Sequence, residues 1–242
     1  MIALLIAIGI IAGIIVATAL ATSRAPATHL EFEGEKLIGI DVSSHNGDID
    51  WQKVSQNVDF AFIRVGYRGY ATGSVNLDKN ARHNIKKATK HGIPVGVYFY
   101  SQAVNPQEAV EEAQFVIDAI DGLDVTLPLV IDFEYAYDDN GDIAGRLFEA
   151  NLTNEQSTSL INAFCQTVED AGYQSGIYAS ASVYERNINT NKLNENAVIW
   201  VAQYANEITY SDNFDIWQYS KTGTLDGIGS KYVDLNYWYV KE

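Results

Sequence analysis

Two carboxylic acids stand at the end of one apolar run. The segment PLVIDFEYAY covers residues 128–137, and its apolar residues 129–131 lead directly into Asp132 and Glu134. Because side chains alternate across a strand, the two acids share one face and lie ~6–7 Å apart. Carboxyls this close cannot both ionise freely, so one pKa rises. Such a pair suits acid–base chemistry, although acids are also ordinary at a strand end that faces solvent.

Apolar segments recur along the chain and predict the elements that would position these acids. Eight of them are rich in β-branched and aromatic residues and are expected to be strands: 37–43, 60–66, 93–101, 127–134, 175–180, 198–204, 214–220 and 232–236. Residues 105–121 and 153–172 carry helical signals, and Thr153 with Gln156 forms a capping-box pattern. The connections between the last three strands are too short for full crossover helices.

The alternation of strands and helices predicts an α/β protein with a parallel sheet. Eight strands within residues 37–242 indicate an irregular TIM-like (β/α) barrel whose last strands lack full helices. The alternative is an open doubly wound sheet, but no glycine-rich phosphate or dinucleotide loop follows any of these strands.

A closed barrel would bring four acids to one mouth, because catalytic residues of such barrels lie at the C-terminal ends of strands. Asp132 and Glu134 close the fourth strand, Asp41 closes the first, and Asp234 is expected at the end of the eighth, beside the first. Aromatic and amide side chains lie near the other strand ends. The candidate substrate-binding residues among them are Tyr98, Tyr100, Tyr178, Gln203, Trp217 and Gln218, and Tyr204 lies beside Gln203 at one of these ends. An acidic cleft walled by aromatic rings suits a sugar polymer.

The N-terminal residues 1–23 carry no charged side chain, and residues 2–22 are apolar and long enough to span a bilayer. No basic residue precedes the apolar run, which favours a transmembrane anchor over a cleaved signal segment. Either would place the remaining chain outside the cell membrane or in the secreted fraction. Residues 24–36 are interpreted as a linker and 37–242 as one catalytic domain, which we expect to be monomeric.

The formal net charge of −15 makes nucleic acid and anionic membrane surfaces poor partners. Cys165 is the single cysteine, which excludes an internal disulfide, and it falls in a helical apolar pattern typical of a core position. Residues 138–142 resemble the start of a calcium loop, but Ile143 stands where the turn needs glycine. The histidines are scattered without metal spacing. We expect neither a metal nor a cofactor.

The chain from Ile38 to Trp238 resembles the glycoside hydrolase family 25 lysozymes, the Chalaropsis-type N-acetylmuramidases. The similarity is carried by GIDVSSHNGDIDWQKV at 39–54, PLVIDFE at 128–134 and GSKYVDLNYW at 229–238, with further matching blocks in order between them. The resemblance implies an irregular β/α barrel. It also implies a peptidoglycan hydrolase that cleaves the β-1,4 bond between N-acetylmuramic acid and N-acetylglucosamine.

The resemblance also implies a role for each acid. Glu134 would be the general acid, Asp132 would assist the acetamido group of the substrate or stabilise positive charge, and Asp41 and Asp234 would complete the acidic site. Phe99 departs from the family, in which many members have histidine. Two other classes stay open. A catalytically inactive sugar-binding barrel would keep the aromatics and lose the acids, and a metal-assisted phosphodiesterase would recruit histidines.

Overall fold

The computed structural model describes residues 36–239. The predicted anchor at 1–23 and nearly all of the predicted linker lie outside these residues. Within the described part of the chain, no helix is both long and apolar enough to cross a membrane. The anchor therefore stays a prediction.

Eight strands of the described chain close into a barrel. In spatial order around it they are β1 (Lys36–Val42), β2 (Phe60–Arg68), β4 (Val95–Ser101), β5 (Leu129–Phe133), β8 (Ser175–Ser180), β9 (Val198–Ala202), β10 (Ile216–Gly223) and β11 (Val233–Tyr239). The barrel closes because β1 pairs with β11 on one side and with β2 on the other. The predicted strands and barrel are confirmed, and the closure excludes the open doubly wound sheet.

The direction of the last strand differs from the prediction. Strands β1 to β10 pair in parallel around the barrel, whereas β11 runs antiparallel to both β10 and β1. Asp234 therefore lies at the beginning of its strand and not at the end. The reason is the short connection at 224–232, which contains no helix and can only reverse the chain direction.

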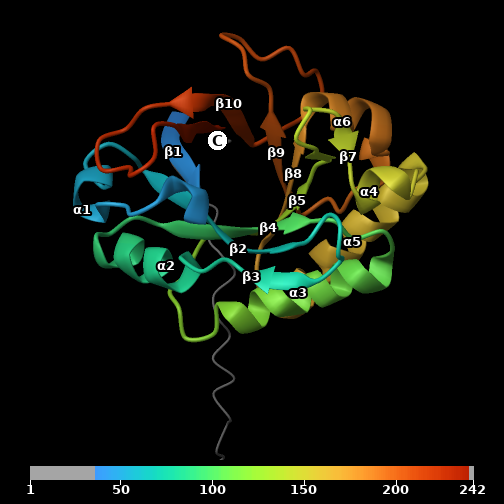
Figure 1. Ribbon diagram of the computed structural model, residues 1–242, viewed down its shortest axis with the longest axis horizontal. Helices are drawn as coiled ribbons and strands as arrows, with labels where there is room; N and C mark the ends of the chain where they lie inside the picture. The colour runs from blue at the N-terminus through green and yellow to red at the C-terminus, as the bar shows by residue number, and fades with distance from the viewer. Residues whose placement is uncertain (1–35, 240–242) are drawn as a thin grey trace, which may run out of the picture.

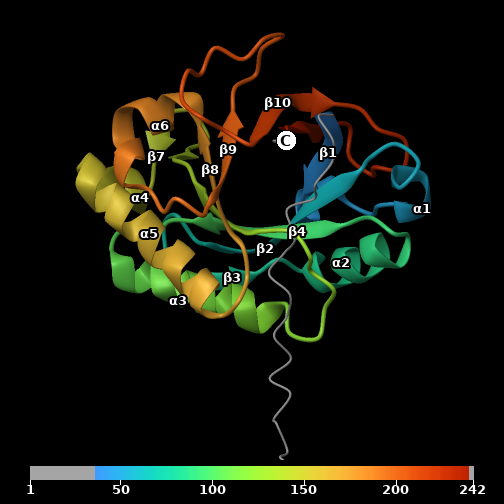
Figure 2. The same ribbon diagram turned by 180° about the vertical axis from the view of Figure 1, so that it is seen from behind.

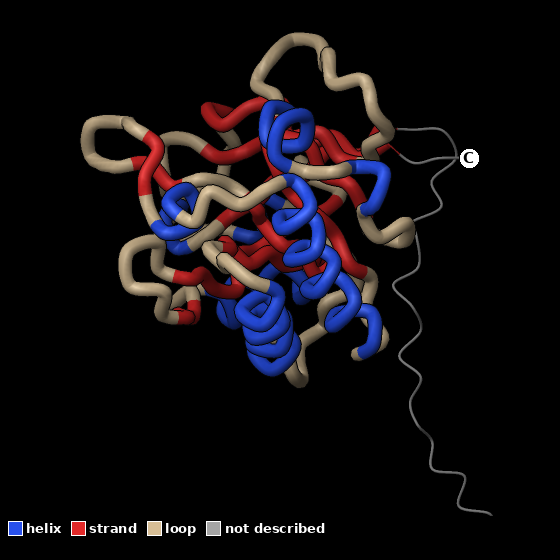
Figure 3. The backbone as a smooth tube through the Cα atoms, turned by 90° about the vertical axis from the view of Figure 1, so that its right-hand side faces the viewer, coloured by secondary structure: helices blue, strands red, loops and turns tan. Residues whose placement is uncertain are grey.

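The larger helices lie outside the barrel. They are α2 (Ala81–Lys90), α3 (Pro106–Ala119), α5 (Asn154–Asp170) and α6 (Ala181–Asn187), with single turns at α1 (Trp51–Val54), α4 (Arg146–Glu149), η1 (Ser44–Asn46) and η2 (Thr190–Lys192). Figures 1 and 2 show α2, α3 and α5 along one side of the barrel, and Figure 3 shows the strands gathered inside. The predicted capping box of Thr153 and Gln156 begins α5. As predicted, the connections after β9 and β10 lack helices.

Two short additions were not predicted. Strand β3 (Val75–Leu77) pairs with β2, and β6 (Ala136–Tyr137) and β7 (Ile143–Ala144) form a hairpin directly after β5. The Asp138 carboxylate accepts the backbone N–H groups of Asn140 at 2.8 Å and Asp142 at 3.0 Å, so the segment with calcium-loop character is the turn of this hairpin. No group of three or more His, Cys, Asp or Glu within residues 36–239 is placed to hold a metal ion.

The core has two layers. The outer layer lies between the helices and the barrel, and it contains the buried Cys165, as predicted, and Phe99, whose ring lies 5.8 Å from that of Phe115 in α3. Phe99 thus faces away from the barrel mouth. The inner layer fills the barrel with aromatic rings, among them Phe62 and Trp200 with centroids 4.7 Å apart. These rings form a floor beneath the mouth of the barrel.

Two glycines make room for this floor. A Cβ built on Gly96 would clash with the ring of Phe62, and one built on Gly39 would clash with Phe60. We predict that Gly96→Ala lowers the free energy of unfolding by about 1–3 kcal/mol, because the aromatic layer must shift. Gly176→Ala is the matched control, since its Cβ would meet a Val130 methyl at 2.9 Å and a methyl group yields more easily than a ring. Urea unfolding measures both. An equal cost for the two variants would contradict the steric argument.

Candidate active site

A cavity of about 170 Å³ opens at the barrel mouth, and all four predicted acids line it. Asp41 comes from β1, Asp132 from β5, Glu134 from the residue just after β5, and Asp234 from the start of β11. The other lining residues are Tyr98, Tyr178, Trp200, Tyr204, Gln218 and Lys221. The closed barrel therefore brings together acids from the two ends of the domain, Asp41 near its start and Asp234 near its end.

The strand register fixes which groups face each other. Asp41 pairs with Asp234 across the antiparallel β1–β11 ladder, and Asp132 pairs with Tyr178 of β8 and Tyr100 of β4. Residues directly opposite one another in a sheet place their side chains on the same face. The barrel thus places the carboxyls of Asp41 and Asp234 next to each other and places Tyr100 and Tyr178 on either side of Asp132.

Two amide side chains hold the Asp41 carboxylate. Gln218 Nε2 and Asn236 Nδ2 each donate a hydrogen bond of 2.8 Å to Asp41 Oδ2. The orientation of each amide is set by its other end, because Gln218 Oε1 accepts the hydroxyl of Tyr178 at 2.8 Å and Asn236 Oδ1 accepts the indole N–H of Trp200 at 2.9 Å. Burial raises the pKa of Asp41 to about 6, and the two amide hydrogen bonds oppose the rise.

The Asp132 carboxyl is strongly biased towards its neutral form. Its side chain is buried, and its pKa is raised well above the ordinary value, first by burial and then by the nearby Glu134 and Asp41. Asp132 Oδ1 has no hydrogen-bond partner among the described residues. A buried polar oxygen without a partner is costly, so this atom is a ready acceptor for a ligand N–H or O–H group.

Glu134 and Asp234 titrate nearer neutrality. Burial raises the pKa of Glu134 to about 7, with the Asp41 charge as the next contribution. Burial and the charges of Asp41 and Glu134 raise the pKa of Asp234 to about 8. The raised pKa was predicted from the closeness of Asp132 and Glu134, but burial is the largest cause for Glu134 and the carboxylate that contributes next is Asp41. At neutral pH, Asp41 carries the charge while Glu134 is divided between its two forms.

Most of the predicted substrate-binding residues lie at this mouth. Tyr98, Tyr178 and Gln218 line the cavity itself. Tyr100 lies beside it, and its pKa is raised by burial and then by the charges of Glu134 and Asp132.

The structure does not bring Gln203 and Trp217 to the cavity, contrary to the prediction. Both residues lie next to an inward-facing neighbour, so strand alternation turns them to the outside of the barrel. The indole N–H of Trp217 donates to the carbonyl oxygen of Gln203 at 2.8 Å, and the Gln203 side chain hydrogen-bonds Thr209 in the following loop. Trp217 also packs against Tyr237, with ring centroids 6.0 Å apart.

Two lining residues, Trp200 and Lys221, were missed by sequence reasoning, whereas Tyr204 was expected at a strand end near the mouth and lines the cavity. Trp200 shares the inward face of β9 and its extension with Tyr204, so the two-residue period of the strand could have identified it. The Tyr204 hydroxyl donates to Gln218 Oε1 at 3.0 Å, and Lys221 Nζ lies 5.1 Å from the centre of the Tyr204 ring. No sequence pattern distinguishes Lys221 from an ordinary surface lysine.

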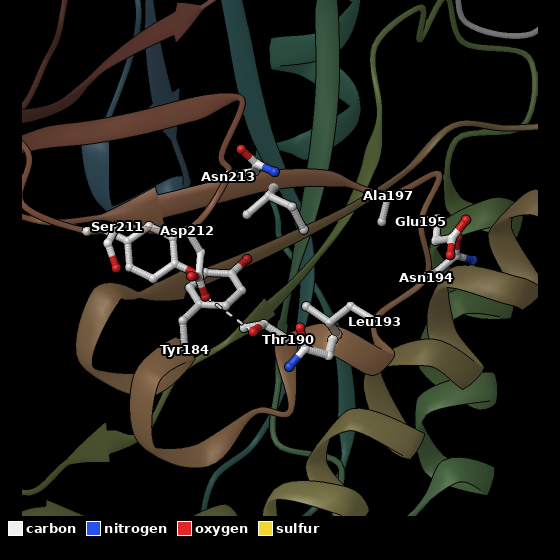
Figure 4. Close-up of a pocket in the computed structure, with 12 residues that line it drawn as sticks. Tyr184, Thr190, Leu193, Asn194, Glu195, Ala197, Ser211, Asp212 and Asn213 are labelled. Atoms are coloured by element: carbon white, nitrogen blue, oxygen red, sulfur yellow. Dashed lines mark hydrogen bonds between the residues drawn. The ribbon is translucent and has the colours of Figure 1, made fainter.

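A larger cavity of about 610 Å³ lies beside the barrel and away from the acids. Figure 4 shows its lining, which includes Tyr184, Leu193 and Asn213, and the hydrogen bond of 3.2 Å between Thr190 and Asp212. None of the four acids lines this cavity. Its size does not make it the better candidate, because the groups suited to acid–base chemistry are all at the barrel mouth.

Comparison with known protein families identifies the class of enzyme to which the chain belongs. The model of the glycosyl hydrolases family 25 matches residues 40–228. The chain belongs to this family. It is therefore a glycoside hydrolase, and the family predicted from the sequence motifs is confirmed.

Solved structures of similar proteins share the fold. The modular autolysin LytC from Streptococcus pneumoniae is 30% identical with a TM-score of 0.69, over 85% of this chain and 47% of that one. A family 25 glycosyl hydrolase from Bacillus anthracis is 26% identical with a TM-score of 0.68, over 88% of this chain and 94% of that one. The chain thus spans about half the length of LytC and nearly all of the Bacillus protein.

A curated relative from Escherichia coli K12, the uncharacterized protein YegX, is 27% identical over 208 residues. The match covers 82% of this chain and 68% of YegX.

Lys221 gives a test of the electrostatics. Its charge lowers the pKa of both Glu134 and Asp234. Removing the charge with Lys221→Met should raise the pKa of Glu134, so the protonated form persists to higher pH. Glycoside hydrolysis needs a protonated carboxyl to donate to the leaving oxygen, so we predict that the alkaline limb of the pH–rate profile moves upward. Lys86→Met, on the outer helix α2, should leave the profile in place. An unchanged or lowered alkaline limb in Lys221→Met would contradict this assignment.

Proposed function

We propose that this family 25 enzyme is a peptidoglycan hydrolase of the lysozyme type, which cleaves the β-1,4 bond between N-acetylmuramic acid and N-acetylglucosamine. The observation that carries the proposal is the pairing of two unlike carboxyls. Glu134 has a pKa raised to about 7 and can hold a proton, while the adjacent Asp132 presents a buried oxygen without a partner among the described residues.

The proposed reaction uses Glu134 as general acid and then as general base. Glu134 donates its proton to the glycosidic oxygen as the bond to the sugar C1 breaks, and the carbonyl oxygen of the 2-acetamido group attacks C1. Asp132 Oδ1 accepts the acetamido N–H and holds the group in line. Glu134 becomes a carboxylate as the sugar becomes cationic, so the net charge of the pocket is conserved. Water then attacks C1 and gives its proton to Glu134.

Asp41 and Asp234 are proposed to stabilise the positive charge of the sugar and to set the pKa of Glu134. Asp41 suits this role because its two amide hydrogen bonds favour the ionised form within the cluster. Tyr98, Tyr178 and Trp200 supply aromatic surface against which sugar rings pack.

The similarity to LytC supports peptidoglycan as the proposed substrate. A structure of the autolysin LytC holds a synthetic peptidoglycan ligand, and LytC shares 30% identity over 85% of this chain.

We further propose that the enzyme acts outside the cell membrane, held there by the apolar N-terminal segment, which keeps it near the wall it cleaves.

Removal of the acid should abolish turnover. We predict that Glu134→Gln lowers the rate of wall hydrolysis by at least about 10²–10⁴-fold, because glutamine cannot donate the proton. Clearing of purified walls, together with mass spectrometry of the fragments, measures the rate and shows whether new reducing ends lie on muramic acid. Glu185→Gln, an exposed position in α6, is the control. New reducing ends on glucosamine would refute the bond assignment.

The role of Asp132 predicts the stereochemistry. Attack by the acetamido oxygen followed by water gives net retention, so the first-formed product should be the β anomer by NMR. Asp132→Asn should lower turnover severely but less than Glu134→Gln. A fluorinated substrate that traps nucleophilic carboxylates should leave Asp132 unmodified. An inverted product or a covalent adduct on Asp132 would rule out substrate assistance while leaving the bond assignment standing.

A further inference from the structure

The catalytic acid Glu134 lies just beyond the part of the sheet that is paired on both sides. The last paired position between β4 and β5 is Ser101 with Phe133, and β5 ends at Phe133. Pairing between β5 and β8 ends one residue earlier, at Asp132 with Tyr178. The orientation of Glu134 therefore depends on a contact other than the strand ladder, because the ladder stops before it.

The side chain of Gln102 supplies that contact. Its amide nitrogen donates to the carbonyl oxygen of Glu134 at 2.9 Å and to that of Ser101 at 2.9 Å. Gln102 directly follows β4, so its side chain bridges the ends of β4 and β5. The peptide plane before Glu134 belongs to Phe133 in β5, and the Gln102 bond fixes the plane after it. Both soft backbone dihedrals of the acid are thereby constrained.

The Gln102 amide can take only one orientation. Both of its hydrogens are used, and a flipped amide would point its oxygen at two carbonyl oxygens. Gln102 is fully buried, and its Oε1 atom has no hydrogen-bond partner among the described residues. An unpaired buried oxygen is costly, and such local costs are typical of positions that serve function.

Two ion pairs anchored on α3 hold the backbone of Gln102. Its carbonyl oxygen accepts Arg146 Nη1 at 2.8 Å, and Arg146 forms two hydrogen bonds of 2.7 Å with the Glu108 carboxylate. Its backbone N–H donates to the Glu112 carboxylate, which pairs with Arg68 at 2.6 Å. Charge-assisted and bidentate pairs of this kind are strong and geometrically specific. Gln102 is therefore fixed against a helix as well as against its own strand.

Gln102 does not line the acidic cavity, whereas Glu134 does. Gln102 can therefore influence the reaction only through the backbone of the acid. A proton donor must be held within a fraction of an ångström of its productive position, and a misplacement of ~1 Å can lower turnover ~10²-fold. A group that fixes the backbone of Glu134 thus affects turnover more than it affects sugar binding.

We propose that Gln102 is the positioning residue of the catalytic acid: its amide holds the Glu134 carbonyl oxygen and so directs the carboxyl towards the glycosidic oxygen. This inference rests on the proposed function, in which Glu134 is the proton donor, and adds to it a residue outside the cavity. The two ion pairs on α3 act one step further away, by holding Gln102 in place.

The first test removes the amide and keeps the length of the side chain. In Gln102→Met we expect kcat on soluble peptidoglycan fragments to fall about 10–10²-fold while KM changes less than about twofold, because the acid is displaced and the sugar contacts are kept. Gln102→Asn keeps an amide that is too short to reach Glu134, so it should show the same loss. Gln114→Met is the matched control and should keep the wild-type kcat, since its amide bonds Asp118 on the exposed side of α3.

Gln102→Glu tests the hydrogen bond itself. The charged side chains around position 102 are Arg68, Glu108, Glu112, Glu134 and Arg146. Both arginines already pair with glutamates, so burial and the neighbouring carboxyls keep the new carboxyl neutral at pH 5. Its hydroxyl can then donate to the Glu134 carbonyl oxygen, which methionine cannot do. At pH 5 we expect Gln102→Glu to keep kcat within about threefold of the wild type.

The outcomes separate this inference from the proposed function. Turnover retained by Glu134→Gln would refute the proposed acid. If Glu134→Gln is inactive and Gln102→Met keeps the wild-type kcat, only the role of Gln102 fails. A raised KM with unchanged kcat would place Gln102 in sugar binding and would also overturn the inference, as would a Gln102→Glu variant no better than Gln102→Met at pH 5. Urea unfolding at the assay pH verifies the fold of each variant, and Gln102→Asn decides the question if Gln102→Met does not fold.

Discussion

The structure is organised around the difficulty of placing four carboxyls in one buried mouth. Burial and mutual repulsion both disfavour the charged forms, so the acids cannot behave alike. The environments of the acids differ. Asp41 accepts hydrogen bonds from two amide donors, which favour its charged form, whereas one oxygen of Asp132 has no partner among the described residues. The pKa values are thereby spread, from about 6 at Asp41 to about 7 at Glu134 and about 8 at Asp234. This spread allows one cluster to contain both an acid and a charge-stabilising group.

The arrangement has a consequence for stability. A carboxyl whose pKa is raised in the folded state binds its proton more tightly there than in the unfolded chain, so folding is favoured below the unfolded pKa and is disfavoured as pH rises through the folded value. The destabilisation by Glu134 and Asp234 therefore grows as pH rises from about 4 to about 8, and it is complete above that range. The aromatic layer beneath the mouth offsets this cost, because Phe62, Trp200 and Trp238 pack against one another in the barrel interior. The same rings exclude water and so maintain the raised pKa values.

Much of this could be predicted from the sequence, because it follows from local patterns. The apolar runs predicted the strands, the Thr153 capping box predicted the start of α5, and the terminal acids of the runs predicted the acidic mouth. The errors have physical causes. The direction of β11 depends on how the chain returns through a short loop, and strand alternation allows only one of Trp217 and Gln218 to face inward. Lys221 and the β6–β7 hairpin depend on tertiary contacts that no local spacing reveals.

The catalytic acid and the segment that follows the β6–β7 hairpin are joined by one network of hydrogen bonds and ion pairs. Arg68 donates to Glu112 at 2.6 Å, and the other oxygen of Glu112 accepts the Ser101 hydroxyl at 2.6 Å. Ser101 precedes Gln102, whose two ends contact Glu134 and Arg146 through the backbone and side-chain hydrogen bonds described above. Breaking a buried ion pair leaves an uncompensated charge and is strongly destabilising, so this network resists distortion. The same network holds the carbonyl of Glu134 through Gln102 and so helps to fix the position of the acid.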